Sequence, residues 1–373
     1  MNVSNKSIPS GQLAHNASIL QRMQSLSPPT QSQHQNWMLQ VTQHAVKVWE
    51  SDFLHELDLN PHLTHLGRDF YELKTTSQLN HKQLLDTGLP RWICPIEHRW
   101  PAHPDAKDFV ERAAQGLMKK FGDAATSIVV VSPTPELRSV ASHVRARLNQ
   151  LSTDLGAQFS NADRTSGATL NALIHRKGVI AGLSNNKIET GSPFDAGLGF
   201  LSPKQEESKV SRAAGKISEV LSLLKIANVD CVDLNHWLEL GAAPGGMTQA
   251  LVEAGASVTA VDLADMKPNL LQHPKVQHLK IHADAIQSAS QYSALLSDMN
   301  GPTELAASIV SRLIKTMSVG AVVVHTLKVQ DFKNMRSAIR MATSSFERSG
   351  AQVILIRHLF HNRKELTIVA VRR

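Results

Sequence analysis

The 373-residue chain has only two cysteines, Cys94 and Cys231. No Cys-x-x-Cys pair can form, which argues against a disulfide framework and against a cysteine zinc site. The histidines are scattered, and the local group Cys94, His98 and His103 does not have the spacing of a metal signature. We therefore expect no metal site, and a reducing compartment such as the cytoplasm.

Long apolar runs are missing too. No stretch approaches the ~20 residues that span a bilayer, so no membrane segment is expected. Acidic residues are absent from the first 49 positions, which are rich in Ser, Gln and Asn. Only Lys6, Arg22 and Lys47 are basic there, fewer than in a typical transit peptide. We expect a disordered polar tail over residues 1–35, with a targeting peptide as the alternative.

Positive charge exceeds negative charge. The formal net charge is +7 and the pI about 9.4, which favours a polyanionic partner such as RNA. The length allows two domains. After the tail we expect an α+β N-terminal domain over residues 36–200, closed by a polar linker, Asn185–Ser208, and then a second domain over residues 201–373.

Within the N-terminal domain the pattern is mixed. It predicts helices at Trp37–Leu57, Ala106–Phe121 and Pro135–Leu151, an ordered loop at Trp92–Pro104, a strand at Ser127–Val131, and a hairpin of Leu170–Ile174 with Val179–Leu183. The third of these helices carries several basic residues. That pattern is typical of a solvated face and is also compatible with contact to RNA phosphates.

The C-terminal domain alternates helix and strand. The pattern predicts helices at Lys209–Lys225, Met247–Ala254, Thr303–Met317 and Phe332–Arg348, and strands at Trp237–Leu240, Ser257–Val261, Val276–Ile281, Ala294–Ser297, Ala321–Leu327, Gln352–Arg357 and Glu365–Val371. Seven residues separate the last two strands, too few for a helical crossover, so these strands must pair antiparallel. A parallel α/β sheet that ends in an antiparallel pair is the layout of class I methyltransferases, which are Rossmann-like with seven strands.

The run Leu238–Gln249 links an apolar strand to a helix through a turn with three glycines and one proline. Glycines let a backbone turn sharply and let a ligand approach it, and the carboxyl end of a strand in an α/β sheet is where nucleotide-like ligands bind. The spacing is neither that of a dinucleotide fingerprint nor that of a P-loop. The cofactor-binding residues expected in this loop are Gly241, Ala242, Pro244, Gly245, Gly246 and Met247.

Two acidic residues extend this predicted site. Asp262 ends the next strand, 21 residues after Gly241, where a carboxylate can accept from both ribose hydroxyls. Asp284 follows the third strand and could accept from an adenine amino group. We further expect a branched side chain at Gly245 to block the cofactor and leave the fold intact.

Four ionisable residues are expected at the same edge of the sheet. Asp298 and Lys328 end the fourth and fifth strands, and Glu365 begins the last, antiparallel strand. Lys216 can reach them from the helix before the first strand. A ribose 2′-hydroxyl needs its proton removed before methyl transfer, and a lysine that is desolvated among other cations can act as the base. We expect Lys328 to be this base, supported by the other three.

These residues resemble a known family. The segments Ser211–Lys216, Ser297–Met299, Leu327–Lys328 and Lys364–Glu365 are similar to the motifs of the FtsJ-like ribose 2′-O-methyltransferases, which carry a Lys-Asp-Lys-Glu tetrad. The stretch Arg357–Thr367 is most similar to the enzymes that methylate cytidine in bacterial large-subunit ribosomal RNA. Ala243 and Met247 depart from this subfamily, which usually has Cys and Trp there.

The resemblance covers about residues 200–373. It implies S-adenosylmethionine as cofactor, Asp298 as a further cofactor contact, ribosomal RNA as substrate, and a THUMP-like RNA-binding fold for the N-terminal domain. Other readings remain open. They are a non-catalytic RNA-binding protein with a methyltransferase fold, a nicotinamide-dependent dehydrogenase, a small-molecule methyltransferase, and a methyltransferase of tRNA or the mRNA cap. Neither the oligomeric state nor the target nucleotide follows from the sequence.

Overall fold

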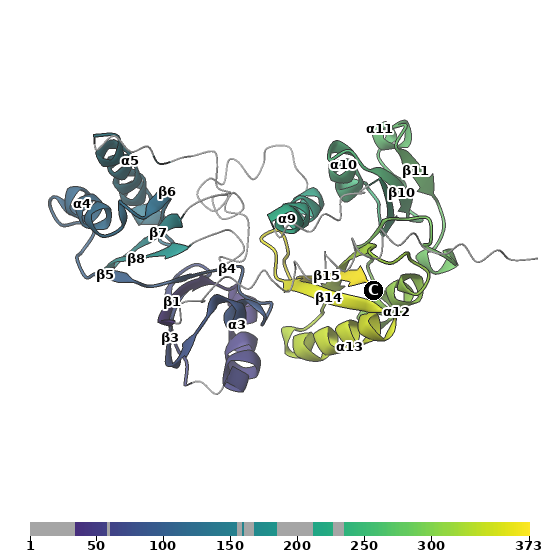
Figure 1. Ribbon diagram of the computed structural model, residues 1–373, viewed down its shortest axis with the longest axis horizontal. Helices are drawn as coiled ribbons and strands as arrows, with labels where there is room; N and C mark the ends of the chain where they lie inside the picture. Colours follow the sequence, from purple (N-terminus) through teal and green to yellow (C-terminus); the bar gives the residue numbers. More distant parts are fainter. Residues whose placement is uncertain (1–33, 58–59, 155–158, 160–167, 185–211, 227–234) are drawn as a thin grey trace, which may run out of the picture.

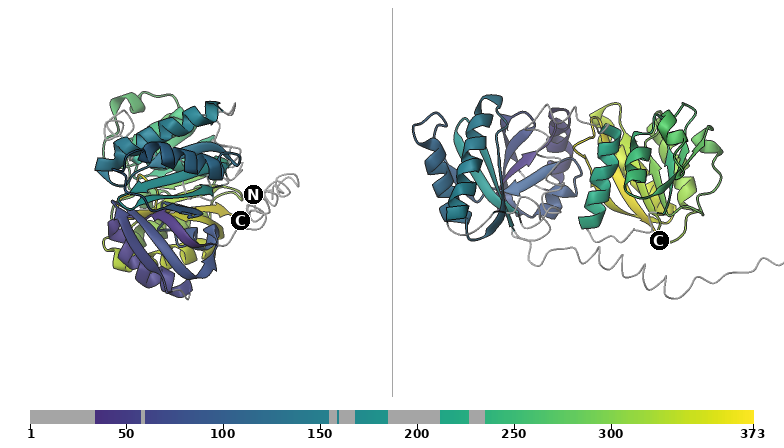
Figure 2. Two further views of the ribbon diagram at one scale, coloured as in Figure 1. Left: turned by 90° about the vertical axis from the view of Figure 1, so that its left-hand side faces the viewer. Right: turned by 90° about the horizontal axis from the view of Figure 1, so that it is seen from above.

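The computed structural model describes residues 34–57, 60–154, 159, 168–184, 212–226 and 235–373. The tail up to residue 33, the linker Asn185–Ser208, Ser211 and Cys231 lie outside these ranges. The described residues form an N-terminal lobe (34–184) and a C-terminal lobe (212–373), which lie side by side (Figures 1 and 2).

Two four-stranded sheets build the N-terminal lobe (Figure 1). The first sheet, of order β2-β3-β1-β4, is antiparallel and consists of β1 (His34–Gln40), β2 (His62–Gly67), β3 (Phe70–Leu79) and β4 (Trp92–Pro95), with α2 (Gln43–Val48), two short helical turns over 49–57 and α3 (His81–Leu85). The second, of order β5-β8-β7-β6, contains β5 (His98–Trp100), β6 (Ala125–Val131), β7 (Ala168–His175) and β8 (Gly178–Ser184), and packs against α4 (Phe109–Phe121) and α5 (Arg138–Asp154).

The sequence interpretation of this lobe is partly wrong. The sequence predicts a helix over Trp37–Leu57, but the first residues of this segment belong to β1, where Trp37 is fully buried. Only the residues from Gln43 onward are helical. The predicted loop Trp92–Pro104 contains β4 and β5. The strands β2 and β3 went unrecognised. By contrast, the two later helices, β6 and the β7–β8 hairpin are confirmed.

The C-terminal lobe has one seven-stranded sheet of order β11-β10-β9-β12-β13-β15-β14. Its strands are β9 (His236–Leu240), β10 (Ser257–Val261), β11 (Val276–Leu279), β12 (Ala294–Ser297), β13 (Val322–Lys328), β14 (Ala351–Arg357) and β15 (Glu365–Arg372). The first five strands are parallel, and β15 pairs antiparallel with both β13 and β14. The predicted α/β architecture and the antiparallel closing pair are confirmed.

Helices cover both faces of this sheet. One apolar core lies under α9 (Arg212–Ile226), α10 (Gly246–Glu253) and the short α11 (Pro268–Leu271). The other lies under α12 (Thr303–Ile314) and α13 (Met335–Arg348). Successive side chains of β9 point to opposite faces of the sheet, so Trp237 packs in the first core and Leu238 in the second. Because the first five strands are parallel, they all end at the same edge of the sheet, which we call the carboxyl edge.

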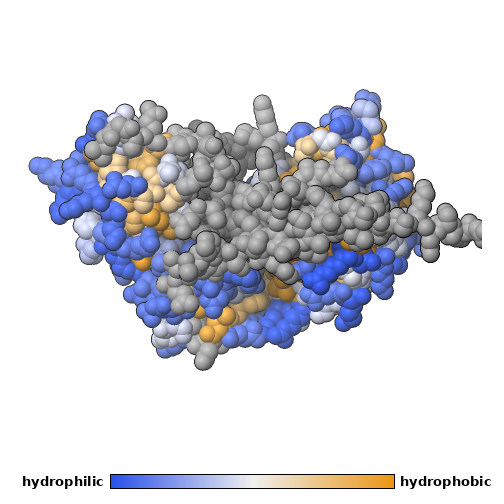
Figure 3. Space-filling model, viewed as in Figure 1, coloured by the Kyte–Doolittle hydropathy of each residue, from blue (hydrophilic) through white to orange (hydrophobic). Residues whose placement is uncertain are grey.

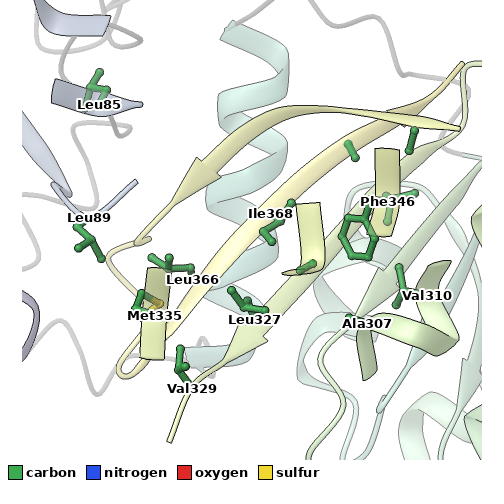
Figure 4. Packing of buried hydrophobic residues seen from close by; sticks show 14 of the residues in the cluster. Leu85, Leu89, Ala307, Val310, Leu327, Val329, Met335, Phe346, Leu366 and Ile368 are labelled. Carbon is green, nitrogen blue, oxygen red and sulfur yellow. The ribbon is translucent and has the colours of Figure 1, made fainter. Parts of the chain in front are cut away.

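The two lobes share an apolar core. Leu85 and Leu89 of the N-terminal lobe belong to the same buried cluster as Val329, Met335 and Leu366 of the C-terminal lobe (Figure 4). Both leucine side chains are buried, with exposed fractions of 5% for Leu85 and 0% for Leu89. Polar contacts add to this interface, since Arg357 Nη1 donates to Leu85 O at 3.0 Å and Arg336 Nη1 to Asp52 O at 2.9 Å. The lobes are therefore joined beside the end of β14, at the carboxyl edge.

The described surface visible in Figure 3 is largely hydrophilic on both lobes and has smaller apolar patches, one of them on the N-terminal lobe at the left. No helix among the described residues is both long and apolar enough to cross a membrane.

Candidate functional site

The turn between β9 and α10 is built by glycines with backbone angles that other residues avoid. Gly241 has φ +78° and Gly245 has φ +105°, both in the left-handed region. A Cβ on Gly241 would lie 2.9 Å from backbone atoms of Met299, so the turn packs closely against the chain that leaves β12. The turn therefore places main chain at the carboxyl edge, close to the end of β12.

Asp262, at the end of β10, holds this turn. Its Oδ2 accepts from Ala243 N at 3.0 Å, and its Oδ1 accepts from Ala264 N at 2.9 Å. A carboxylate oxygen has two lone pairs, so each oxygen can accept one more hydrogen bond. The same carboxylate thus shapes the loop and keeps acceptor capacity for a ligand diol.

The other predicted ligand residues lie at the same edge in different environments. Pro244 is exposed, whereas Ala242 and Met247 are each 3% exposed and Gly246 is buried at the start of α10. The Met247 side chain lies in the core beneath α10, so only its main chain can face a ligand. Asp284 is exposed in a short helical turn after β11, and its backbone oxygen accepts from Arg312 Nη2 at 2.9 Å.

The expected effect of a branched residue at Gly245 has to be corrected. A Cβ there would lie 2.2 Å from Leu270 Cδ1 and 3.1 Å from Met266 Cε, so it points into the packing of α11 and not into open space. Gly245→Val should therefore destabilise the fold itself. We expect a loss on the order of 1–3 kcal/mol in the free energy of unfolding, from strain and overpacking.

Gly255→Val is the matched control for this prediction. Gly255 has a similar φ of +100°, but nothing lies within 4 Å of its Cβ position. Denaturant unfolding of both variants separates backbone strain, which they share, from the clash with Leu270, which only the first has. Equal losses in the two variants would contradict the packing argument.

Glu239, which the sequence reasoning did not select, lies directly beneath the loop. It is 2% exposed in β9, and Thr248 Oγ1 of α10 donates to its Oε2 at 2.6 Å. Burial raises the pKa of Glu239 to about 8, helped by the charges of Asp298 and Asp262. The sequence feature that points to Glu239 is its position as the one acidic residue of the apolar strand that leads into the glycine turn.

Glu239→Gln is expected to flatten the pH dependence of stability. The folded-state pKa of about 8 lies above the unfolded value of 4.5, so the folded protein binds the extra proton between these pH values. The contribution of Glu239 to the free energy of unfolding is therefore complete below pH 4.5 and is lost as the pH rises toward 8. The loss is on the order of a few kcal/mol. Denaturant unfolding at pH 5 and pH 8 should show a smaller difference for the variant, and an unchanged difference would refute this assignment.

The four predicted ionisable residues meet at the carboxyl edge as a row of alternating charges. Lys216 Nζ of α9 lies 2.5 Å from Glu365 Oε1 and 3.4 Å from Asp298 Oδ2. Lys328 Nζ lies 3.1 Å from Asp298 Oδ1. The order is therefore Glu365, Lys216, Asp298, Lys328, with each inner residue between two opposite charges. In the sheet, Lys328 and Glu365 are direct partners of β13 and β15.

Exposure distinguishes the two lysines. The side chain of Lys216 is 10% exposed, that of Lys328 25%, and those of Asp298 and Glu365 16% each. Lys328 Nζ also donates to Asp298 O and Asn300 Oδ1, both at 2.8 Å. Lys216 is thus the inner, structural cation of the row, and Lys328 is the one that a large substrate can reach. Asn300 had not been selected from the sequence.

No cluster of three or more His, Cys, Asp or Glu side chains suited to a metal occurs among the residues that the structure describes. The row of four can provide proton transfer and charge stabilisation, next to a main-chain turn held by a carboxylate. This geometry suits a nucleoside cofactor placed beside a hydroxyl substrate.

Comparison with known proteins identifies the domain that holds this site. Residues 209–351 match the family described as FtsJ-like methyltransferase. The chain carries an FtsJ-like methyltransferase domain. Glu365 lies beyond the matched residues, and the other three members of the row lie within them. The FtsJ-like domain is that of a methyltransferase enzyme.

Similarity to individual proteins extends outside the FtsJ-like domain. The chain is 26% identical over 306 residues to Ribosomal RNA large subunit methyltransferase M of Xylella fastidiosa strain M12, covering 80% of this chain and 78% of that protein. It is 30% identical over 133 residues to the protein of the same name in Pseudomonas aeruginosa strain UCBPP-PA14, covering 35% and 38%. Among solved structures, Aeropyrum pernix fibrillarin with bound S-adenosylmethionine has a TM-score of 0.30 at 15% identity, covering 37% of this chain and 66% of that one.

Proposed function

We propose that this protein is an S-adenosylmethionine-dependent 2′-O-methyltransferase of RNA ribose, acting on ribosomal RNA of the large subunit. The observation that carries the proposal is the row Glu365, Lys216, Asp298, Lys328 beside the glycine turn. The substrate class is supported by the relatives, whose name is Ribosomal RNA large subunit methyltransferase M, and by the net charge of +7.

The finer fold assignment belongs to the same proposal. The strand order of the C-terminal lobe, with one antiparallel strand between two neighbours, supports a class I, Rossmann-like methyltransferase sheet. We propose domain limits of 36–200 and 201–373, with the α+β N-terminal domain as a divergent THUMP-like RNA-binding unit. The two sheets and two long helices of the N-terminal lobe support a separate folding unit there.

The residues around the turn fit S-adenosylmethionine. Gly241 and Gly245 give the turn its left-handed backbone and its close packing, and Asp262 has free acceptor capacity for ribose hydroxyls. Two exposed apolar residues, Leu263 (47%) and Ile281 (38%), follow β10 and β11 and would cover the faces of an adenine ring. Asp284 would accept from its amino group. The bound cofactor supplies an electrophilic methyl group on a sulfonium.

Lys328 would then act as the general base. In the resting site Lys328 Nζ donates to Asp298 O and Asn300 Oδ1, and its charge is paired with Asp298 Oδ1 at 3.1 Å. Asn300 is exposed, so a substrate hydroxyl can take its place next to Nζ. Lys328 Nζ would accept the proton of the 2′-hydroxyl as its oxygen takes the methyl group and the methyl–sulfur bond of the cofactor breaks, while Asp298 and Lys216 would keep both amines oriented.

A second function from another class is a non-catalytic RNA-binding protein. The row of four speaks against it, because a binding surface has no need for two lysines held by two largely buried carboxylates. Mapping of ribose methylation across total RNA from cells with and without this protein tests the proposal. Loss of one 2′-O-methyl group in large-subunit ribosomal RNA is expected. A lost mark in tRNA or at an mRNA cap would correct the substrate, and an unchanged map would overturn the function.

A further inference from the structure

The loop between β14 and β15, residues 358–364, leads directly into Glu365 of the charged row. One side of this loop packs on α9, the helix that carries Lys216. Phe360 N donates to both carboxylate oxygens of Glu219, at 3.0 and 3.2 Å. Gly215 meets the loop so closely that a Cβ would lie 2.5 Å from His361 Nδ1. The loop and α9 are therefore packed together and joined by hydrogen bonds.

The other side of the loop is held by the N-terminal lobe. Arg91, which immediately precedes β4, is 6% exposed. Its Nη2 donates to Asn362 O at 2.5 Å and lies 3.2 Å from His358 Nε2. The guanidinium carbon also lies 6.0 Å from the centre of the Phe360 ring. One residue of the N-terminal lobe thus contacts the loop at its first, third and fifth positions.

The neighbouring backbone strengthens this contact. His358 N donates to Gly88 O at 2.7 Å, three residues before Arg91. Burial and the nearby Arg91 cation lower the pKa of His358, so its imidazole is neutral and does not repel the guanidinium. At the far end of the loop, Val329 N donates to Lys364 O at 3.4 Å, next to Lys328. The loop therefore connects Arg91 to both ends of the charged row.

We propose that Arg91 is a positioning residue for methyl transfer. It fixes the β14–β15 loop, and through the loop it places Glu365 against Lys216. The inference rests on the proposed function and extends it, because the lobe expected to hold RNA then also shapes the catalytic geometry. A displacement of about 1 Å in a catalytic group can lower a rate 10²-fold, so a remote contact of this kind has a measurable effect.

Arg91→Met tests this role in the full-length protein. Methionine keeps an unbranched apolar stem in place of the arginine methylenes and removes the guanidinium that donates to Asn362 O. We expect kcat for RNA methylation to fall by about 10- to 100-fold, while the KM for RNA and the Kd for S-adenosylmethionine stay within about threefold. Arg91→Lys, which retains a cation and one donor, should recover part of kcat.

Arg99→Met is the matched control. Arg99 makes a two-pronged ion pair with Glu72, at 2.6 and 3.0 Å, within the N-terminal lobe. It should leave kcat within about threefold of the unchanged protein. Amide hydrogen exchange of residues 358–364 gives a second readout, and it should accelerate in the Arg91 variants and not in Arg99→Met.

The outcomes are separable. If the unchanged protein transfers no methyl group to RNA, the proposed function fails. If it does and Arg91→Met matches its kcat, or Arg99→Met loses as much, the role of Arg91 is overturned. Should Arg91→Met not fold, Arg91→Lys decides: reduced kcat with faster loop exchange supports the role, and full kcat with unchanged exchange refutes it.

Discussion

Replacing Lys328 by alanine is expected to lower the rate of RNA methylation by a factor on the order of 10² to 10⁴, the usual contribution of a general base. Cofactor binding should be retained, because the carboxylate that holds the turn belongs to Asp262, whereas Lys328 Nζ donates to Asp298 O and Asn300 Oδ1. Single-turnover kinetics with saturating cofactor and RNA would measure the chemical step directly.

Lys328→Arg separates a base from a fixed charge. A guanidinium can reach Asp298 and keep the ion pair, but it stays protonated at any accessible pH. We therefore expect Lys328→Arg to be nearly as inactive as the alanine variant. Lys315→Ala, an exposed lysine just after α12, is the control and should keep full activity. An active Lys328→Arg enzyme would mean that Lys328 only supplies charge and that the proton leaves by another path.

Removing the N-terminal lobe is expected to abolish methylation and to weaken the remaining domain. A fragment that begins at residue 209 loses Leu85 and Leu89 from the shared core, and burying a leucine contributes roughly 1.5–3 kcal/mol. It also leaves the buried Arg357 without its acceptor on Leu85. Turnover should fall by more than about 10²-fold, because RNA contacts and loop geometry are lost together.

Three measurements distinguish these causes. Thermal unfolding reports the lost core, calorimetry with S-adenosylmethionine reports the glycine turn, and the salt dependence of RNA affinity reports the phosphate contacts. A fragment that begins at His34 is the control, since all contacts between the lobes described above lie after that residue. If the fragment from residue 209 methylates RNA as well as the full chain, the N-terminal lobe is neither an RNA-binding domain nor a support for the site.

The charged row could be predicted from the sequence because topology alone brings its members together. Asp298 and Lys328 end neighbouring parallel strands, and Glu365 begins an antiparallel one, so all three must lie at one edge once the strands are recognised. The strands themselves are short apolar runs between glycine or proline turns, which is the clearest local signal a sequence offers. The register of β13 with β15 then pairs Lys328 with Glu365.

The N-terminal lobe was harder to predict because its strands lack that signal. β2 is partly exposed along its whole length and has few apolar residues, so nothing in His62–Gly67 marks a strand. Trp37 begins an apolar stretch that fits a helix and a strand equally well. Here pairing with β3 and β4, which lie far along the chain, decides the structure over local preference.

Contacts between distant segments could not be predicted at all. Arg91 meets Asn362 across 271 residues, and neither position carries a pattern that points to the other. The direction of Gly245 toward Leu270 likewise depends on how α11 packs, which the turn sequence does not encode. The direction of a side chain and the packing of one lobe on the other depend on the whole fold. For this reason the prediction for Gly245 had to be corrected and the contact of Arg91 could not be predicted.

The most direct test of the account is the chemical position of the transferred methyl group. Purified full-length protein would be incubated with S-adenosylmethionine labelled in its methyl group and with large-subunit ribosomal RNA from cells that lack the protein. The RNA would then be digested to nucleosides for mass spectrometry. The account predicts label in a single 2′-O-methylated nucleoside, and none with Lys328→Ala. Label on a base, or equal label with the Lys328 variant, would contradict it.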